Sequence, residues 1–276
     1  MKSTVKKYVI IAVLLCAVIP AFAFEEGWVL NMRADIGGSF TTPFISESDL
    51  SKLGANKMEG MVGFIGGGRA EVGYIFDTAK HFKLPEDHWF SGVGAFGRIG
   101  VTQGYSGQIS GSLVDVGGEQ KQVDVFVNVF YTPVITMGAA GKAYFFDNKL
   151  AVGLSVGAEM IADTSPSYEI YSTDPETIGA EVGTIIVDEW MMTHMNPFMA
   201  TFDVFAEYNV KILDTTELIL GGYIGYNIYS PGYVTMPKKV LDMAITNFDF
   251  DPHAPLKSYF INSLDFGLTF ALGFKL

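Results

Sequence analysis

The sequence predicts an all-β protein, an eight-stranded antiparallel transmembrane β-barrel of the outer-membrane type. Eight segments alternate apolar and polar side chains with the period of two that a β-strand produces. Within these segments, charged residues fall on one face only. The connections between them are alternately long and short, as in outer-membrane barrels with an even number of strands.

Residues 1–23 are expected to form a secretory signal peptide that is removed near Ala23. Three lysines within the first seven residues precede an apolar run, and small residues follow at its end. The run is too short for a membrane anchor, because a spanning helix needs about 20 apolar residues. We therefore expect residues 24–276 to form one barrel domain, located in the bacterial outer membrane.

The composition favours strands and argues against nucleic-acid binding. Hydrophobic residues make up 49% of the chain, yet no apolar stretch after the expected signal is long enough for a transmembrane helix. The formal net charge of −12 leaves no basic patch for a polyanion. The only cysteine, Cys16, lies in the expected signal, so burial and backbone pairing must stabilise the mature chain.

The first four predicted strands each oppose an apolar face to a charged one. The fourth contains Pro133, which cannot donate a backbone hydrogen bond to a neighbouring strand. The alternation keeps its parity across Pro133, so we favour one strand that bends there over two shorter strands. The four segments are residues 28–36 (Met32 and Ile36 against Arg33 and Asp35), 58–76 (Val62 and Val72 against Arg69 and Glu71), 89–105 (Ile99 and Val101 against Arg98) and 122–146 (Met137 and Ala143 against Lys142).

The last four predicted strands repeat the pattern. The final one ends in FGLTFALGFKL and places its phenylalanines and leucines on one parity, which we expect to face lipid. This strand should pair with the first and close the barrel, because unpaired backbone groups find no water in a bilayer. The four segments are residues 150–162 (Val152 and Leu154 against Glu159), 198–210 (Phe202 and Val204 against Asp203 and Glu207), 218–229 (Leu220 and Ile224 against Asn227) and 259–276 (Leu268 and Phe270 against Asp265).

The connections suggest which end of the barrel faces outward. With the N-terminus on the periplasmic side, short turns lie in the periplasm and long loops lie outside the cell. The expected long connections are 37–57, 106–121, 163–197 and 230–258, and the shorter ones are 77–88, 147–149 and 211–217.

A soluble β-sandwich or a lipocalin-like barrel would also alternate. Two features favour the membrane barrel. Aromatic residues lie near the ends of the apolar faces, as in interfacial girdles. The polar faces are rich in glycine and in opposite charges, which suits a narrow interior better than open water.

The charged face is expected to line the lumen as a network of ion pairs, because an unpaired charge in a low-dielectric interior is costly. The excess of acids over bases suggests water or ions inside, and a selectivity filter is the alternative role. The predicted lumen-facing charges are Arg33, Asp35, Glu59, Arg69, Glu71, Arg98, Lys142, Glu159, Asp203, Glu207 and Asp265.

From Thr132 to Met160 the sequence has a proline-containing strand (Pro133), a tight turn and a return strand with alternating glycines, Gly153 and Gly157. This pattern resembles the OmpW family of small outer-membrane barrels, and the resemblance covers roughly 30 residues plus the signal and the terminal strand. The resemblance implies an eight-stranded barrel with a narrow, partly apolar channel for small hydrophobic molecules. The chain departs from the usual pattern of such barrels by ending in Leu276 rather than an aromatic residue.

An apolar lumen lining is expected from the fourth segment. Phe126, Phe130 and Val134 lie on its inward parity. They could line an apolar conduit or simply fill the barrel, since eight strands leave room mainly for side chains.

We predict no enzyme, no catalytic residue, no metal site and no cofactor. Asp251 and His253 resemble the Asp-x-His of omptin proteases. Those enzymes also need a second acidic pair, and no Asp-x-Asp occurs elsewhere in the mature chain.

The predicted function is that of a narrow channel or porin for small solutes, hydrophobic ones included. The alternative is a non-conducting surface barrel whose extracellular loops mediate host or partner interaction. The expected partners are the lipid bilayer, the outer-membrane assembly machinery (through the C-terminal strand) and small solutes.

Overall fold

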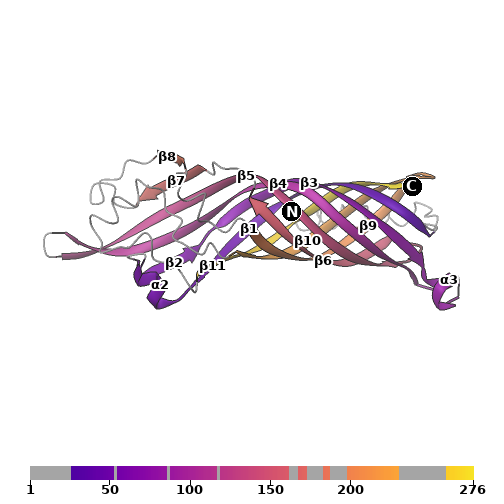
Figure 1. The fold of residues 1–276 in the computed structure, drawn as a ribbon, viewed down its shortest axis with the longest axis horizontal. Coiled ribbons are helices and arrows are strands. Elements are labelled where there is room, and N and C mark those ends of the chain that lie inside the picture. The colour runs from indigo at the N-terminus through magenta and orange to yellow at the C-terminus, as the bar shows by residue number, and fades with distance from the viewer. Residues whose placement is uncertain are drawn as a thin grey trace, which may run out of the picture.

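The computed structural model describes residues 26–52, 55–85, 88–116, 119–161, 167–172, 183–186, 198–229 and 259–276. Within this part of the chain, eight antiparallel strands form a closed barrel, and a long hairpin projects from one end (Figure 1). The expected signal peptide lies outside the described residues. The barrel strands are β1 (Gly27–Ile45), β3 (Val62–Asp77), β4 (Phe90–Val116), β5 (Glu119–Phe145), β6 (Leu150–Ile161), β9 (Phe198–Leu213), β10 (Thr216–Tyr229) and β11 (Tyr259–Lys275).

Pairing between the first and last strands closes the ring. Strand β1 pairs with β11 from Val29↔Lys275 to Ile45↔Tyr259, and each remaining strand pairs with its neighbours in chain order. Closure satisfies the backbone groups of all eight strands, which is the condition for strands to cross a bilayer. The predicted fold class, an eight-stranded outer-membrane-type barrel, is confirmed.

The barrel is apolar outside and polar inside, the reverse of a soluble barrel. Outward side chains such as Ile36, Leu154 and Leu268 are at least half exposed, while inward side chains such as Arg33 and Glu71 are buried. An alternating strand with this polarity is stable when lipid covers the outside. No helix among the described residues is long and apolar enough to cross a membrane.

The end of the barrel that carries the C-terminus has short connections. The turn between β5 and β6 places Phe146, Asp147 and Asn148 at positive φ, and residues 214–215 connect β9 to β10. The third connection contains α3 (Thr78–Phe82), whose N-terminal cap is the Asp77 carboxylate, a hydrogen-bond acceptor for two backbone N–H groups. These short connections lie where the sequence predicts them.

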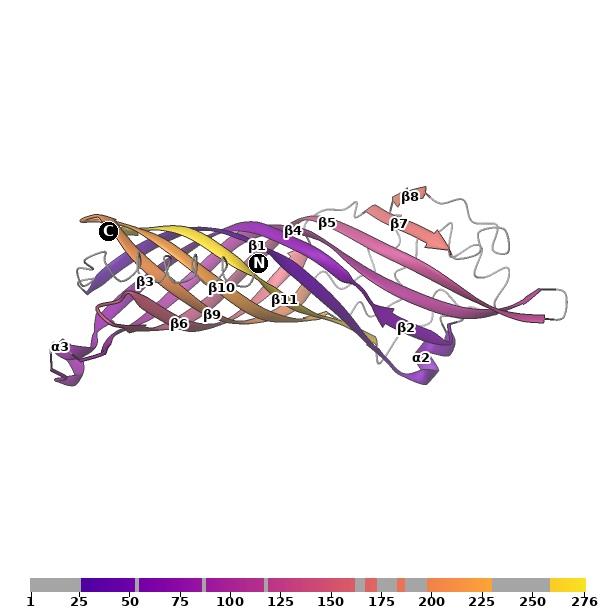
Figure 2. The ribbon, with the colours of Figure 1, turned by 180° about the vertical axis from the view of Figure 1, so that it is seen from behind.

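The opposite end differs from the expectation of loops alone. Strands β4 and β5 pair as far as Val116↔Glu119, so most of the expected connection 106–121 is a projecting hairpin (Figure 2). Residues 108–111 of β4 pair with β2 (Lys57–Gly60), and residues 125–130 of β5 pair with β7 (Ser167–Ser172). Strand β7 in turn pairs with β8 (Gly183–Ile186), so a five-stranded sheet extends beyond the ring.

The expected strand 58–76 is two strands rather than one. It is interrupted at Met61, and the piece before it, β2, pairs with β4 instead of β1. Strand β1 itself continues past the predicted end at Ile36, through Gly37, to Ile45, and the helix α2 (Glu47–Lys52) follows. The glycine at position 37 marks a close approach and not the end of the strand. A Cβ there would lie 2.9 Å from both the Tyr223 hydroxyl and the Gly267 Cα, so a larger residue would not fit.

Pro133 bends one strand and does not divide two. Strand β5 is continuous, but the pairing shifts from Thr102↔Val134 to Gly104↔Tyr131, which places an extra residue on β5 at the proline. Such a β-bulge interrupts the alternation of the strand that carries it. The expectation that parity is unchanged across Pro133 is therefore wrong.

Candidate functional site in the barrel lumen

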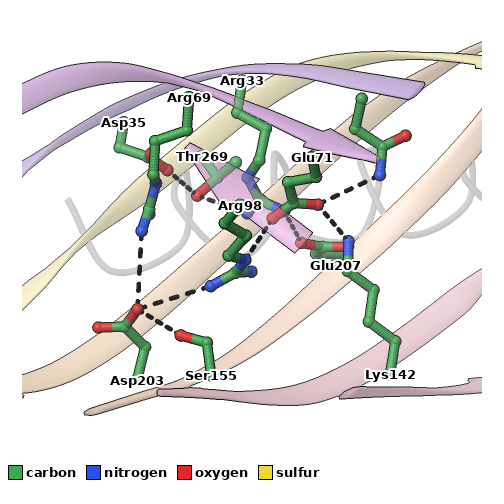
Figure 3. A network of polar contacts seen from close by, with 11 residues as sticks. Arg33, Asp35, Arg69, Glu71, Arg98, Lys142, Ser155, Asp203, Glu207 and Thr269 are labelled. Atoms are coloured by element: carbon green, nitrogen blue, oxygen red, sulfur yellow. Dashed lines mark hydrogen bonds and ion pairs between the residues drawn. The ribbon is translucent and has the colours of Figure 1, made fainter. Parts of the chain in front are cut away.

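A network of charged side chains fills the lumen at mid-barrel (Figure 3). At its centre, Glu71 of β3 accepts ion pairs from Arg33 of β1 at 2.9 Å, Arg98 of β4 at 2.7 Å and Lys142 of β5 at 2.8 Å. The amide of Asn31 donates to the same carboxylate at 3.2 Å. One carboxylate on β3 thus joins strands β1, β4 and β5.

The network crosses the full width of the barrel. Strand β9 lies opposite β3 in the ring, and its Glu207 forms ion pairs with both Arg33 and Lys142, the latter at 2.9 Å. Arg33 and Lys142 therefore bridge the two opposed carboxylates. The side chains of all four residues are 0–1% exposed, so little space remains between them.

A second layer of pairs lies next to this centre, toward the projecting hairpin. Arg69 pairs with Asp35 at 2.8 Å and approaches Asp203 at 3.6 Å, and Arg98 approaches the same Asp203 oxygen at 3.6 Å. The hydroxyl of Thr269 donates to Asp35 at 2.6 Å. Through Thr269, this layer adds β11 to the strands that the central network joins.

Two aromatic rings complete the central layer. The Arg98 guanidinium lies 4.6 Å from the centre of the Phe205 ring, and the Lys142 ammonium lies 4.6 Å from the centre of the Phe96 ring. Cation–π contacts of this kind offset part of the cost of removing the cations from water. Neither ring is among the predicted site residues, although both lie on the charged parity of their segments, and that parity could have identified them.

The remaining predicted lumen charges have different surroundings. Glu159 and Asp265 are buried and line a small chamber beside Asp203, and neither forms an ion pair with a base among the described residues. Glu59 does not face the lumen: it is exposed on β2, which lies outside the ring because its partner is the projecting part of β4. The expectation for Glu59 is corrected accordingly.

The predicted apolar lining is only partly placed. Val134 is fully buried inside the barrel. The side chains of Phe126 and Phe130 lie outside the described residues. Their predicted inward direction assumed an unbroken alternation past Pro133, and the bulge interrupts that alternation. The structure therefore gives no support for an inward direction of these two side chains.

This arrangement can neutralise the buried charges of the lumen and can close the lumen at this level. Each carboxylate of the two layers has a basic partner within 4 Å, which offsets the cost of burying it. No group of three or more His, Cys, Asp or Glu side chains that could hold a metal ion occurs among the described residues. Asp251 and His253, which resemble the omptin pair, lie outside the described residues.

A closed barrel with an apolar exterior and a charge-filled lumen defines the class of outer-membrane-type β-barrels. No protein-family model matches the chain, and no curated protein sequence matches it. Remote likenesses exist among solved structures, and the barrel class rests on the strand pairing and not on them. They include Neisserial surface protein A (10% identity, 90% of this chain and 97% of that chain, TM-score 0.31), the outer-membrane protease OmpT from Escherichia coli (8%, 94% and 99%, 0.33) and the outer-membrane protein OprG from Pseudomonas aeruginosa (6%, 93% and 100%, 0.29).

Proposed function

We propose that the chain is exported, enters the bacterial outer membrane through recognition of its C-terminal strand, and acts there as a non-conducting surface barrel. The barrel anchors the projecting hairpin, and the hairpin with its neighbouring loops contacts a host or partner surface. The observation that carries this proposal is the ion-pair network from Glu71 to Glu207, which joins opposite walls of the lumen.

The network supports a closed lumen on energetic grounds. A solute that passed this level would have to separate Lys142 or Arg33 from its carboxylates. Removing one partner of a buried ion pair costs about 3–5 kcal/mol, because the other charge is left uncompensated. Passage of small solutes, the other function expected from the sequence, would require this network to open.

The strand lengths support a surface role for the hairpin. Strands β4 and β5 each have 27 residues, whereas β6 has 12. A transmembrane β-strand needs only about 9–11 residues. More than half of β4 and β5 therefore extends beyond the bilayer, where it presents a paired sheet to the surroundings of the cell.

Conductance separates the two candidate functions. The purified full-length protein, reconstituted in planar bilayers, is expected to give no current steps above those of the lipid alone. Lys142→Ala, which removes the bridge between Glu71 and Glu207, serves as the comparison and should raise the leak if the variant folds. Reproducible single-channel steps from the unaltered protein would contradict the proposal and restore the channel.

Surface binding is tested by shortening the hairpin. Replacing residues 107–128 with a two-residue turn keeps Pro133 and the membrane part of the barrel. Cells carrying this variant should insert the barrel normally but attach less to host cells or matrix-coated surfaces than cells carrying the full chain. Equal attachment, with equal amounts of inserted barrel, would show that the hairpin has no such role.

A further inference from the structure

The lumen contains a small chamber next to the ion-pair network, on the side of the projecting hairpin. Its volume is about 40 Å³, and Asp35, Asp203, Glu159 and Asp265 contribute carboxylates to its wall. A buried water needs about 10–15 Å³ of such space, so the chamber has room for roughly three waters or for one small ion with part of its hydration shell.

The charges around the chamber do not balance. Asp35 pairs with Arg69, and Asp203 lies between Arg69 and Arg98, so these two carboxylates share the available bases. Glu159 and Asp265 form no ion pair with any described residue, although both are more than nine-tenths buried. Two buried carboxylates at one chamber therefore lack a counter-charge.

Polar atoms in the chamber wall also lack hydrogen-bond partners. The Asn227 amide donates to one carboxylate oxygen of Asp265, but the other oxygen, Oδ1, has no partner among the described residues. The hydroxyls of Thr102 and Thr136, which line the same chamber, are buried and likewise unpartnered. A buried polar atom without a partner costs about 1–3 kcal/mol, so an occupant that satisfies these atoms is favoured.

We infer that the chamber binds one small monovalent cation, such as sodium or potassium, together with water. The cation supplies the charge that Glu159 and Asp265 lack, and Asp265 Oδ1 and the hydroxyl oxygens of Thr102 and Thr136 supply ligand atoms. Waters alone would satisfy the hydrogen bonds but would supply no counter-charge to Glu159 and Asp265 when both are ionised. A divalent metal is disfavoured, because no three of the acidic side chains among the described residues are placed so that together they could hold a metal ion, and because Arg69 and Arg98 lie in the same wall.

Unfolding in matched salts tests this site. The full-length protein in lipid vesicles is unfolded with urea in sodium chloride, potassium chloride or choline chloride at one ionic strength. The choline ion is too large for the chamber, so the unfolding midpoint should be higher in sodium or potassium than in choline. Asp265→Asn and Glu159→Gln keep the shape of each side chain but remove its charge, and each should abolish this difference.

Glu217 provides a matched control, because it is a buried carboxylate that does not line the chamber. Glu217→Gln should retain the salt dependence of the unaltered protein. Equal midpoints of the unaltered protein in all three salts would overturn the inference, as would a difference that persists in both chamber variants.

Crystals of the unaltered protein grown or soaked in thallium(I) give a readout that does not depend on variants folding. An anomalous peak within coordination distance of Asp265 Oδ1 is expected, and its replacement by water density alone would overturn the inference.

Discussion

At the scale of single residues, burial decides which ion pairs stabilise the protein. The pairs Lys142–Glu71 and Lys57–Asp124 have almost equal lengths, 2.8 and 2.9 Å. The first is fully buried in the lumen, whereas the second lies partly exposed on the projecting sheet. The two pairs therefore form a natural comparison of the same chemistry in two environments.

Lys142→Ala is expected to destabilise the barrel by about 3–5 kcal/mol, because it leaves Glu71 and Glu207 facing each other with one bridge fewer. Lys57→Ala should destabilise the protein much less, because water screens an exposed pair. Urea unfolding in lipid vesicles measures both changes. Similar losses in the two variants would show that the lumen network does not behave as a buried one.

A second prediction at this scale concerns pH. Hydrogen bonds from Lys80, His81 and Tyr74 lower the pKa of Glu26 from 4.5 to about 2. Because the folded pKa is lower than the ordinary value, the contact between Glu26 and α3 contributes fully above pH 4.5 and is lost as the pH falls toward 2. A carboxyl NMR titration of Glu26 should give this low pKa, and the amides of α3 should exchange faster below it. A midpoint near 4.5 would contradict the contact.

At the scale of elements, depth in the bilayer decides what an outward position tolerates. Leu154 lies in the middle of β6 and Leu213 at the end of β9, and both are 63% exposed on the barrel. Exposure alone therefore does not distinguish them.

Leu154→Lys is expected to cost about 2–4 kcal/mol in lipid, whereas Leu213→Lys, next to the turn, should cost about 0–1 kcal/mol. The physical reason is that a lysine at the end of the strand reaches the interface and one at mid-strand does not. Unfolding in vesicles of defined thickness measures the difference. Equal costs would place the hydrocarbon core elsewhere on the barrel.

At the scale of the whole molecule, closure predicts the behaviour of the chain on gels. A barrel without free edges in its ring resists detergent, so the unboiled protein should migrate differently from the boiled one. The mature protein should begin at Phe24 if the proposed signal is removed after Ala23. Electrophoresis and N-terminal sequencing check these outcomes, and a chain that stays soluble without detergent would contradict the membrane assignment.

Periodicity made the barrel predictable. The outward parity of segments such as 150–162 and 259–276 follows from the alternation alone, because successive side chains of a strand point to opposite faces whatever the neighbours are. The pairing of the last strand with the first also followed, since a bilayer allows no free edge. The same reasoning failed for Glu59, because β2 lies outside the ring although its residues still alternate. It also failed across Pro133, because the extra residue of the bulge interrupts the alternation.

The alternation along the chain is enough to predict the barrel, its lipid face and the confinement of charge to the opposite face. It does not predict that Glu71 meets Arg33, Arg98 and Lys142, that Glu207 faces Glu71 across the lumen, or that Glu159 and Asp265 lack a basic partner among the described residues. These contacts could not be foreseen because alternation is a local property of each strand. The partners of an inward side chain depend on the register between strands, which is fixed when all eight close into one ring.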